Sequence, residues 1–248
     1  MKKTIECKNV SIAYKYGDFK DIGLKEWVLR HIRNNYQVSF LIADDNISFD
    51  LYEGDMLGII GVNGAGKSTL LKAIAGVMKP KKGSVITNGK ISALLELTAG
   101  FDNDLNLKEN IYLRGALLGY TREYINQKYD EIIDFAGLRE FEDRPYKQLS
   151  SGMKSRLAFS VSSLVNPDIL ILDEVLSVGD GAFREKSAKK IKEIINNGAT
   201  TIFVSHSLED IRTLCNKVLW IDKGKQIEFG ETKDVCDKYQ AFLNKKSN

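Results

Sequence analysis

The sequence predicts a mixed α/β fold: a doubly wound core of parallel strands, a small antiparallel sheet near the N-terminus and an inserted helical subdomain. Short apolar runs alternate with helical patterns over much of the chain, which is typical of a sheet covered by helices on both faces. The strand candidates nearest the N-terminus have no helix between them, which indicates antiparallel pairing. The stretch from about residue 99 to 166 has an almost entirely helical pattern, so we expect it to interrupt the core.

The strands are expected where short apolar runs are bounded by polar residues or glycine. The runs at residues 56–60 and 169–172 are apolar on both faces, as in the buried centre of a parallel sheet. The run at 47–51 alternates with polar residues, which indicates one face exposed to water. The predicted strands span residues 4–10, 47–51, 56–60, 91–97, 169–173, 200–205 and 218–221.

Helical periodicity occupies much of the sequence between these strands. We predict a single domain over residues 1–248, with a β-rich core at about 1–98 and 167–248 and a helical subdomain at 99–166. The predicted helices span residues 67–75, 107–118, 122–135, 152–165, 182–196 and 208–215, with a further helical pattern at 235–243.

Residues 15–43 form a segment that the core pattern does not explain, and we predict an insertion here. A helical stripe within it allows two interpretations: a surface helix packed on the sheet, or an element that contacts a partner or a membrane surface. Its apolar positions are Leu24, Trp27, Val28 and Ile32, and charged residues lie largely on the other side.

Composition excludes several classes of protein. The net charge of +3 is too small to indicate a nucleic-acid binder by itself. No uncharged apolar run reaches the length of about 18 residues that a membrane-spanning helix needs, and an acidic residue stands where a signal peptide needs its apolar centre. The 3 cysteines show no paired spacing, which favours a reducing compartment, and the 2 histidines exclude a multi-histidine metal site.

A phosphate-binding loop (P-loop) follows a buried strand and precedes a helix. Its pattern is G-x-x-x-x-G-K-[ST], in which glycines let backbone N–H groups surround phosphate oxygens at a helix N-terminus. Lys67 supplies a cation for the β and γ phosphates, Ser68 can ligate Mg²⁺ and Thr69 assists phosphate contact. The pattern alone leaves kinases, GTPases and motor ATPases open. The loop reads Gly61, Val62, Asn63, Gly64, Ala65, Gly66, Lys67, Ser68 and Thr69.

Two carboxylates stand at the end of the second buried strand. Asp173 and Glu174 follow the apolar run 169–172, at the edge where parallel sheets bind ligands. Asp173 can hold Mg²⁺ through water, and Glu174 is placed to polarise an attacking water as a general base. On these residues alone, ordinary solvated acids at a strand end are an equally good interpretation.

Further features occur in the order found in a known family. The stretch 149–153, Leu-Ser-Ser-Gly-Met, precedes the acidic strand and resembles the LSGGQ signature of ATP-binding cassette (ABC) proteins. His206 ends a later strand, and residues 177–180 lie where this family has its D-loop. Tyr14 follows the first strand, where the family stacks an aromatic ring on adenine. The chain therefore resembles an ABC transporter ATP-binding subunit from Tyr14 to His206.

This resemblance implies a RecA-like core, ATP and Mg²⁺ as ligands, and a head-to-tail homodimer. Each ATP is then held between one subunit's P-loop and the partner's Ser150, Ser151 and Gly152. The resemblance assigns His206 to a γ-phosphate contact, with a core histidine as the alternative, and makes it catalytic together with Lys67 and Glu174. It also implies an integral-membrane permease in two copies, a peripheral position on the cytoplasmic face of the cell membrane, and no nucleic-acid partner.

Three positions depart from the general pattern of the family. Ser151 replaces the first signature glycine and Met153 replaces the glutamine, while Glu96 is the best match to the Q-loop glutamine. A glutamate there can approach Mg²⁺ but cannot donate a hydrogen bond when ionised. Together with the insertion at 15–43, these departures resemble the ATPase subunits of polysaccharide exporters. Some of those carry a C-terminal carbohydrate-binding domain, which we expect this chain to lack.

The implied function is therefore an ATP-hydrolysing subunit of an exporter that moves lipid-linked polysaccharide of O-antigen, teichoic acid or capsule type. A transporter of another cargo, such as a drug or a lipid, is the main alternative. A soluble ABC ATPase of chromosomes or ribosomes is the weaker alternative, because no heptad run for a coiled coil lies between Lys67 and Asp173 and only one cassette is present.

Overall fold

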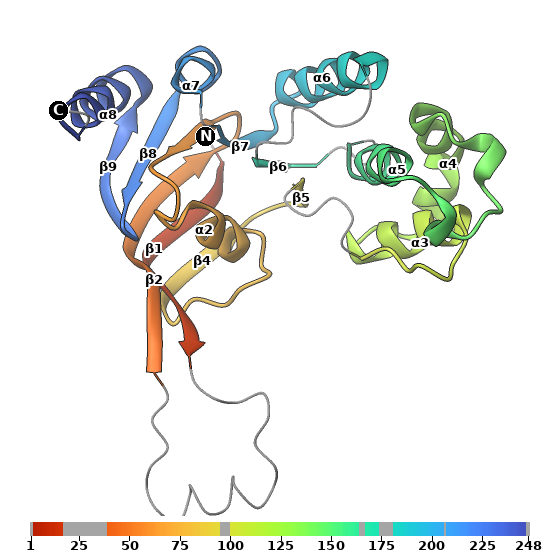
Figure 1. Cartoon of the computed structure of the whole chain (residues 1–248), viewed down its shortest axis with the longest axis horizontal. Helices are drawn as coiled ribbons and strands as arrows, with labels where there is room; N and C mark the ends of the chain where they lie inside the picture. The colour runs from red at the N-terminus through yellow and green to blue at the C-terminus, as the bar shows by residue number, and fades with distance from the viewer. Residues whose placement is uncertain are drawn as a thin grey trace, which may run out of the picture.

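The strands of the described residues form one sheet. The computed structural model describes residues 2–16, 39–94, 100–163, 167–173, 181–205 and 207–246. Within these ranges, nine strands follow one another in the order β4-β1-β2-β9-β8-β3-β7-β6-β5 (Figure 1). The predicted mixed α/β architecture is confirmed.

The parallel part of the sheet positions the site. β3 (Met56–Ile60) pairs in parallel with β7 (Thr200–Val204), which pairs in parallel with β6 (Ile169–Asp173). β3 and β7 are buried at every position, as their apolar sequences predict. Because parallel strands end at the same edge, the loop after β3 and the carboxylate that ends β6 lie at one edge of the sheet.

Two other strands extend this parallel part. β8 (Lys217–Asp222) pairs with β3, and β5 (Ile91–Ala93) pairs with β6. β5 is shorter than predicted, because Leu94 already lies outside the strand and residues 95–97 lie outside the described residues.

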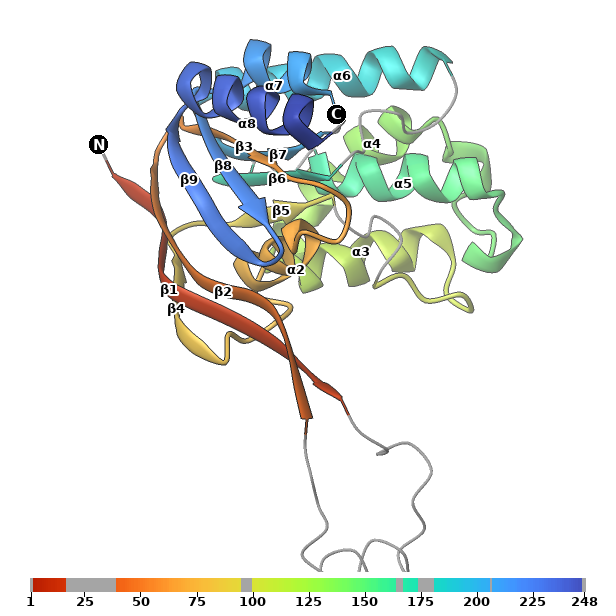
Figure 2. The same cartoon turned by 60° about the vertical axis from the view of Figure 1, so that its left-hand side comes forward.

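The antiparallel strands predicted near the N-terminus are present and longer than expected, and they form one part of the single sheet. β1 (Lys3–Tyr16) pairs antiparallel with β2 (Ser39–Tyr52) and with β4 (Lys82–Thr87). β1 and β2 enter the predicted insertion 15–43 from both ends and leave the body of the molecule as a two-stranded arm (Figure 2). The helical stripe predicted around Trp27 lies outside the described residues.

Two strands were not predicted from the sequence. β4 is largely exposed and polar, so it lacks an apolar run, and β9 (Lys225–Glu231) is partly exposed and has a glycine near its end. β9 pairs antiparallel with β8 and meets β2 in parallel at the register pair Asp45 and Lys225. It therefore joins the antiparallel part of the sheet to the parallel part.

The predicted helices that fall on described residues are all present, most with ends shifted by one to three residues. Side-chain caps set the starts of α3, α4 and α7, whereas α2 begins after Gly66 without one. At the start of α3, for example, the Asn106 side chain accepts a hydrogen bond from the Glu109 backbone and the Glu109 carboxylate accepts one from the Asn106 backbone. The helices are α2 (Lys67–Ile74), α3 (Leu107–Leu117), α4 (Arg122–Ala136), α5 (Ser151–Ser163), α6 (Gly181–Asn196), α7 (Leu208–Leu214) and α8 (Thr232–Lys246).

Helices cover both faces of the sheet. α2 packs on one face through Leu70, Leu71 and Ile74, whereas α6, α7 and α8 pack on the opposite face (Figure 2). A separate apolar cluster lies among α3, α4 and α5, which supports the predicted helical subdomain. Its boundaries at 99–166, and those of the core at 1–98 and 167–248, stay a prediction.

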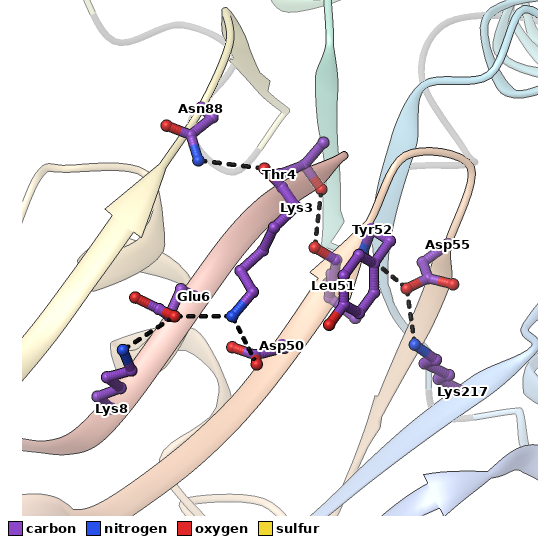
Figure 3. A network of polar contacts seen from close by, with 10 residues as sticks. All are labelled: Lys3, Thr4, Glu6, Lys8, Asp50, Leu51, Tyr52, Asp55, Asn88 and Lys217. Carbon is purple, nitrogen blue, oxygen red and sulfur yellow. Dashed lines mark hydrogen bonds and ion pairs between the residues drawn. The ribbon is translucent and has the colours of Figure 1, made fainter. Parts of the chain in front are cut away.

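A network of polar contacts joins several strands of the sheet (Figure 3). The Asp55 carboxylate accepts hydrogen bonds from the Tyr52 backbone and from Lys217 Nζ, each at 2.8 Å. Thr4 Oγ1 donates to the Leu51 carbonyl and lies 2.9 Å from Thr200 Oγ1. These contacts join β1, β2, β7 and β8.

None of the helices formed by the described residues has the length and apolar content needed to cross a bilayer.

Candidate nucleotide-binding site

The loop between β3 and α2 has the backbone of a phosphate cradle. Gly61, Gly64 and Gly66 have φ angles of 152°, 75° and 113°, a region that side chains with a Cβ rarely adopt. A Cβ on Gly61 would lie 2.2 Å from the Ile221 carbonyl oxygen, so this glycine also permits close packing against β8. The predicted glycine-rich turn is therefore required by both conformation and space.

Neighbouring strands hold the loop in place. The Gly224 backbone, in the turn between β8 and β9, donates a 2.8 Å hydrogen bond to the Ala65 carbonyl. The Gly224 carbonyl accepts a 2.7 Å hydrogen bond from the Asp45 backbone on β2. The loop is thus connected to both parts of the sheet.

Lys67 lies at the centre of the loop. Its side chain is buried, and Nζ donates to the carbonyl oxygens of Gly61 at 2.8 Å and Val62 at 3.1 Å. An ammonium held across its own loop presents a positive charge where the backbone N–H groups at the start of α2 also point. This arrangement suits an anion with several oxygens.

A cleft of about 580 Å³ lies beside the loop and brings several predicted residues together. Asp173 and Tyr14, which are distant in the sequence, both line it with the P-loop. Gly61 does not line it and lies behind the loop against β8. The lining residues are Tyr14, Leu41, Ile42, Ala43, Asn63, Gly64, Ala65, Gly66, Lys67, Ser68, Thr69, Asp173, Val204 and Lys223.

The two sides of the cleft differ in chemistry. On one side, the Tyr14 hydroxyl shares a 3.2 Å hydrogen bond with Thr69 Oγ1, and the side chains of Leu41 and Ile42 are exposed. An aromatic ring and two exposed aliphatic side chains provide an apolar surface for a planar base. On the other side lie Lys67 and the loop backbone, so the cleft suits a ligand with an apolar base and an anionic tail.

The cleft also contains oxygen donors that fit Mg²⁺. Ser68 supplies a hydroxyl and Asp173 a carboxylate, and Mg²⁺ prefers such hard oxygen ligands while keeping several waters. No group of three acidic, histidine or cysteine side chains suited to a metal occurs among the described residues. The residues present therefore fit a Mg²⁺ ion whose remaining ligands come from phosphate and water. Glu96, the third predicted metal ligand, lies outside the described residues.

The predicted signature residues lie elsewhere in the chain. Ser150 Oγ accepts a 3.3 Å hydrogen bond from the Met153 backbone at the start of α5. Ser150, Ser151 and Gly152 are exposed and do not line the cleft of their own chain. The structure thus separates them from the P-loop within one subunit.

Some predicted residues are not tested by the structure, and some residues that line the cleft were missed. Glu174, His206 and residues 177–180 lie outside the described residues, so their roles stay predictions.

Lys223 was missed because β9 was not predicted, and so the turn that carries this lysine was not recognised. It lines the cleft with a φ of 49°, and a Lys-Gly pair after an apolar run is the signal that could have identified it.

Comparisons with known proteins identify the class to which this fold and site belong. The family model of the ABC transporter matches residues 45–177. The fold is similar to an ATP-binding subunit of an ABC transporter (TM-score 0.72, 20% identity, covering 96% of this chain and 93% of the other). It is also similar to the dimeric bacterial cassette MJ0796 (TM-score 0.68, 22% identity, covering 92% and 98%). The chain belongs to the ABC transporter family and is an ABC transporter ATPase.

Two relatives within that family are ATP-binding proteins of export systems for cell-surface polymers. The chain is 42% identical to the O-antigen export system ATP-binding protein RfbB of Klebsiella pneumoniae, covering 98% of this chain and all of that protein. It is 41% identical to the teichoic acids export ATP-binding protein TagH of Bacillus anthracis, over 99% of this chain but 44% of TagH. The chain thus spans less than half the length of TagH.

Replacing Lys67 with alanine is expected to weaken ATP binding by about 100-fold, because a charge-assisted contact to phosphate is lost. The dissociation constant of a fluorescent ATP analogue measures this. Lys79→Ala removes the same charge from an exposed position after α2 and should leave the affinity unchanged. Equal affinities for Lys67→Ala and the wild type would contradict the assignment of Lys67 to phosphate binding.

Proposed function

We propose that the chain is the ATPase subunit of an ABC exporter that moves lipid-linked cell-surface polysaccharide, of O-antigen, teichoic acid or capsule type, across the cytoplasmic membrane. The observation that carries the ATPase part is the cleft that unites the P-loop with Tyr14 and Asp173. Near-full-length similarity to O-antigen export ATP-binding proteins supports the choice of cargo.

In this proposal, each residue of the site has its own role in ATP hydrolysis. The Tyr14 ring stacks on the base, and the loop backbone and Lys67 bind the phosphates. Ser68 and Asp173 would hold Mg²⁺, which would supply positive charge beside the phosphates. Glu174, one residue after the end of β6, polarises the attacking water, and His206 contacts the γ-phosphate. Glu96 would be the third metal ligand.

A second copy of the chain completes the site in this proposal. Ser150, Ser151 and Gly152 are exposed at the start of α5 and do not line their own cleft, so they are free to reach the nucleotide of a partner. A Ser-Gly helix start is suited to a γ-phosphate. The dimer closes when ATP is bound and opens after hydrolysis. Two permease subunits receive this movement, and the ATPase stays peripheral on the cytoplasmic face.

Purification from membranes and depletion of the protein test the transport part. A tagged chain extracted in mild detergent should co-purify with an integral-membrane permease. Depletion should trap lipid-linked glycan on the cytoplasmic side, and complementation with wild type, but not with Glu174→Gln, should restore export. If the glycan reaches the surface normally in depleted cells, the polysaccharide assignment is wrong, and accumulation of a drug or another lipid would identify the cargo instead.

A further inference from the structure

A buried carboxylate lies directly beneath the phosphate-binding loop. Asp44 on β2 has no exposed surface, and neither of its carboxylate oxygens has a hydrogen-bond partner among the described residues. Its Oδ1 lies 2.0 Å from the point that a Cβ on Gly66 would occupy, which places it against the backbone at the start of α2. The neighbouring Ala43 lines the cleft. An unpaired buried acid at this position is costly, so its presence requires an explanation.

Among the described residues, neither a hydrogen bond nor a nearby charge offsets the burial of Asp44. On its own strand, Asp45 accepts a 3.0 Å hydrogen bond from Ser11. From the loop, Lys67 directs Nζ to the carbonyls of Gly61 and Val62, and from the β8–β9 turn Lys223 lines the cleft. On β1, Tyr14 bonds to Thr69. Burial is the cause that raises the pKa of the Asp44 carboxyl, to about 7.

The protonation state of this group matters for an anionic ligand. When Asp44 is ionised, a negative charge lies behind the same glycine that turns its backbone toward phosphate, and in a buried site such a charge is poorly screened. When Asp44 is protonated, this charge disappears and no longer opposes the phosphates. A phosphate and an ionised Asp44 therefore disfavour each other.

We propose that Asp44 is a positioning residue of the P-loop that couples nucleotide binding to proton uptake: the loop binds nucleotide phosphates with Asp44 protonated. The proton comes from solvent and is released when the nucleotide leaves. Affinity therefore falls as the pH rises through the neutral range. This inference rests on the nucleotide binding of the proposed function and adds a pH dependence to it.

Calorimetric titration with magnesium and a non-hydrolysable ATP analogue tests the proposal between pH 6 and 8.5. The wild type should lose about tenfold in affinity across this range relative to Asp44→Asn, because one charge acts on the phosphates at short range. Buffers of different ionisation enthalpy should show proton uptake in the wild type. Asp44→Asn cannot ionise at this position and should lack this uptake. The difference between the wild type and Asp44→Asn also removes the contribution from titration of the nucleotide itself.

Asp45→Asn is the matched control, because it changes the neighbouring acid and leaves Asp44 in place. It should keep the wild-type pH profile, and Asp44→Leu should follow the flat profile of Asp44→Asn if the amide variant folds poorly. Identical pH profiles and identical proton uptake for the wild type and the Asp44 variants would overturn the proposal while leaving nucleotide binding intact. Absence of nucleotide binding at every pH would instead overturn the proposed function.

Discussion

Gly66→Ala is expected to destroy nucleotide binding and to destabilise the protein by about 3–5 kcal/mol. Gly66 has a φ of 113°, where an alanine is strained. Its new Cβ would lie 2.0 Å from Asp44 Oδ1 and 3.1 Å from the Ala43 carbonyl oxygen. Because Asp44 is fully buried, its carboxylate cannot move into solvent to relieve the contact. The start of α2 must shift, and the phosphate cradle shifts with it.

Urea unfolding and nucleotide affinity measure the two effects of Gly66→Ala. Gly64→Ala is the control in the same loop, since Gly64 has a φ of 75° but no atom within 4 Å of its Cβ position. That variant should lose only about 1 kcal/mol, from backbone strain alone. If the two variants were equally stable, the close packing of Gly66 on Asp44 would not matter to the fold.

The parts of the site that were predictable from sequence are those with local signals. The P-loop combines a buried strand, glycines and a lysine within a few residues, and each of these has a local physical reason. Asp173 was predictable because an acid directly after an apolar run marks the carboxyl end of a parallel strand. Tyr14 was predicted from its place in the motif order, and the structure brings it to the cleft with Asp173.

The parts that were missed depend on pairing between distant strands. Leu41 and Ile42 line the cleft because β2 pairs with β1 beyond the predicted end of both strands, so that Tyr14 lies opposite Leu41. Lys223 reaches the cleft because β9 joins β8 to β2, with Asp45 and Lys225 as a register pair. No local pattern in the sequence encodes these contacts.

Asp44 shows the same limit most clearly. In the sequence it is one of two adjacent acids before an alternating strand, which is typical of a solvated strand start. In the structure Asp45 bonds to Ser11, whereas Asp44 points the other way, beneath the loop. Successive side chains of a strand face opposite sides, so one of two adjacent acids is buried once the register is set. The sequence does not reveal which of them it is.

Glu174→Gln is expected to lower the rate of ATP hydrolysis by about 10²–10⁴-fold while ATP affinity stays close to that of the wild type. Glu174 follows Asp173, which ends β6 and lines the cleft. Glutamine has nearly the same shape as glutamate but cannot accept a proton from the attacking water. The variant should therefore bind ATP, close the dimer and remain closed, because the hydrolysis that opens it no longer occurs.

Phosphate release measures turnover in Glu174→Gln, and size-exclusion chromatography with ATP and Mg²⁺ measures dimerisation. Glu185→Gln, an exposed position on α6, is the matched control and should hydrolyse ATP at the wild-type rate. Adding Ser150→Ala to Glu174→Gln should weaken the ATP-bound dimer, because Ser150 is exposed and absent from its own cleft and, in the proposed dimer, contacts the partner's nucleotide. Near-normal turnover in Glu174→Gln would remove this glutamate as the general base and direct attention to His206. If the dimer forms equally well without the Ser150 hydroxyl, this hydroxyl does not contribute to the contact that closes the dimer.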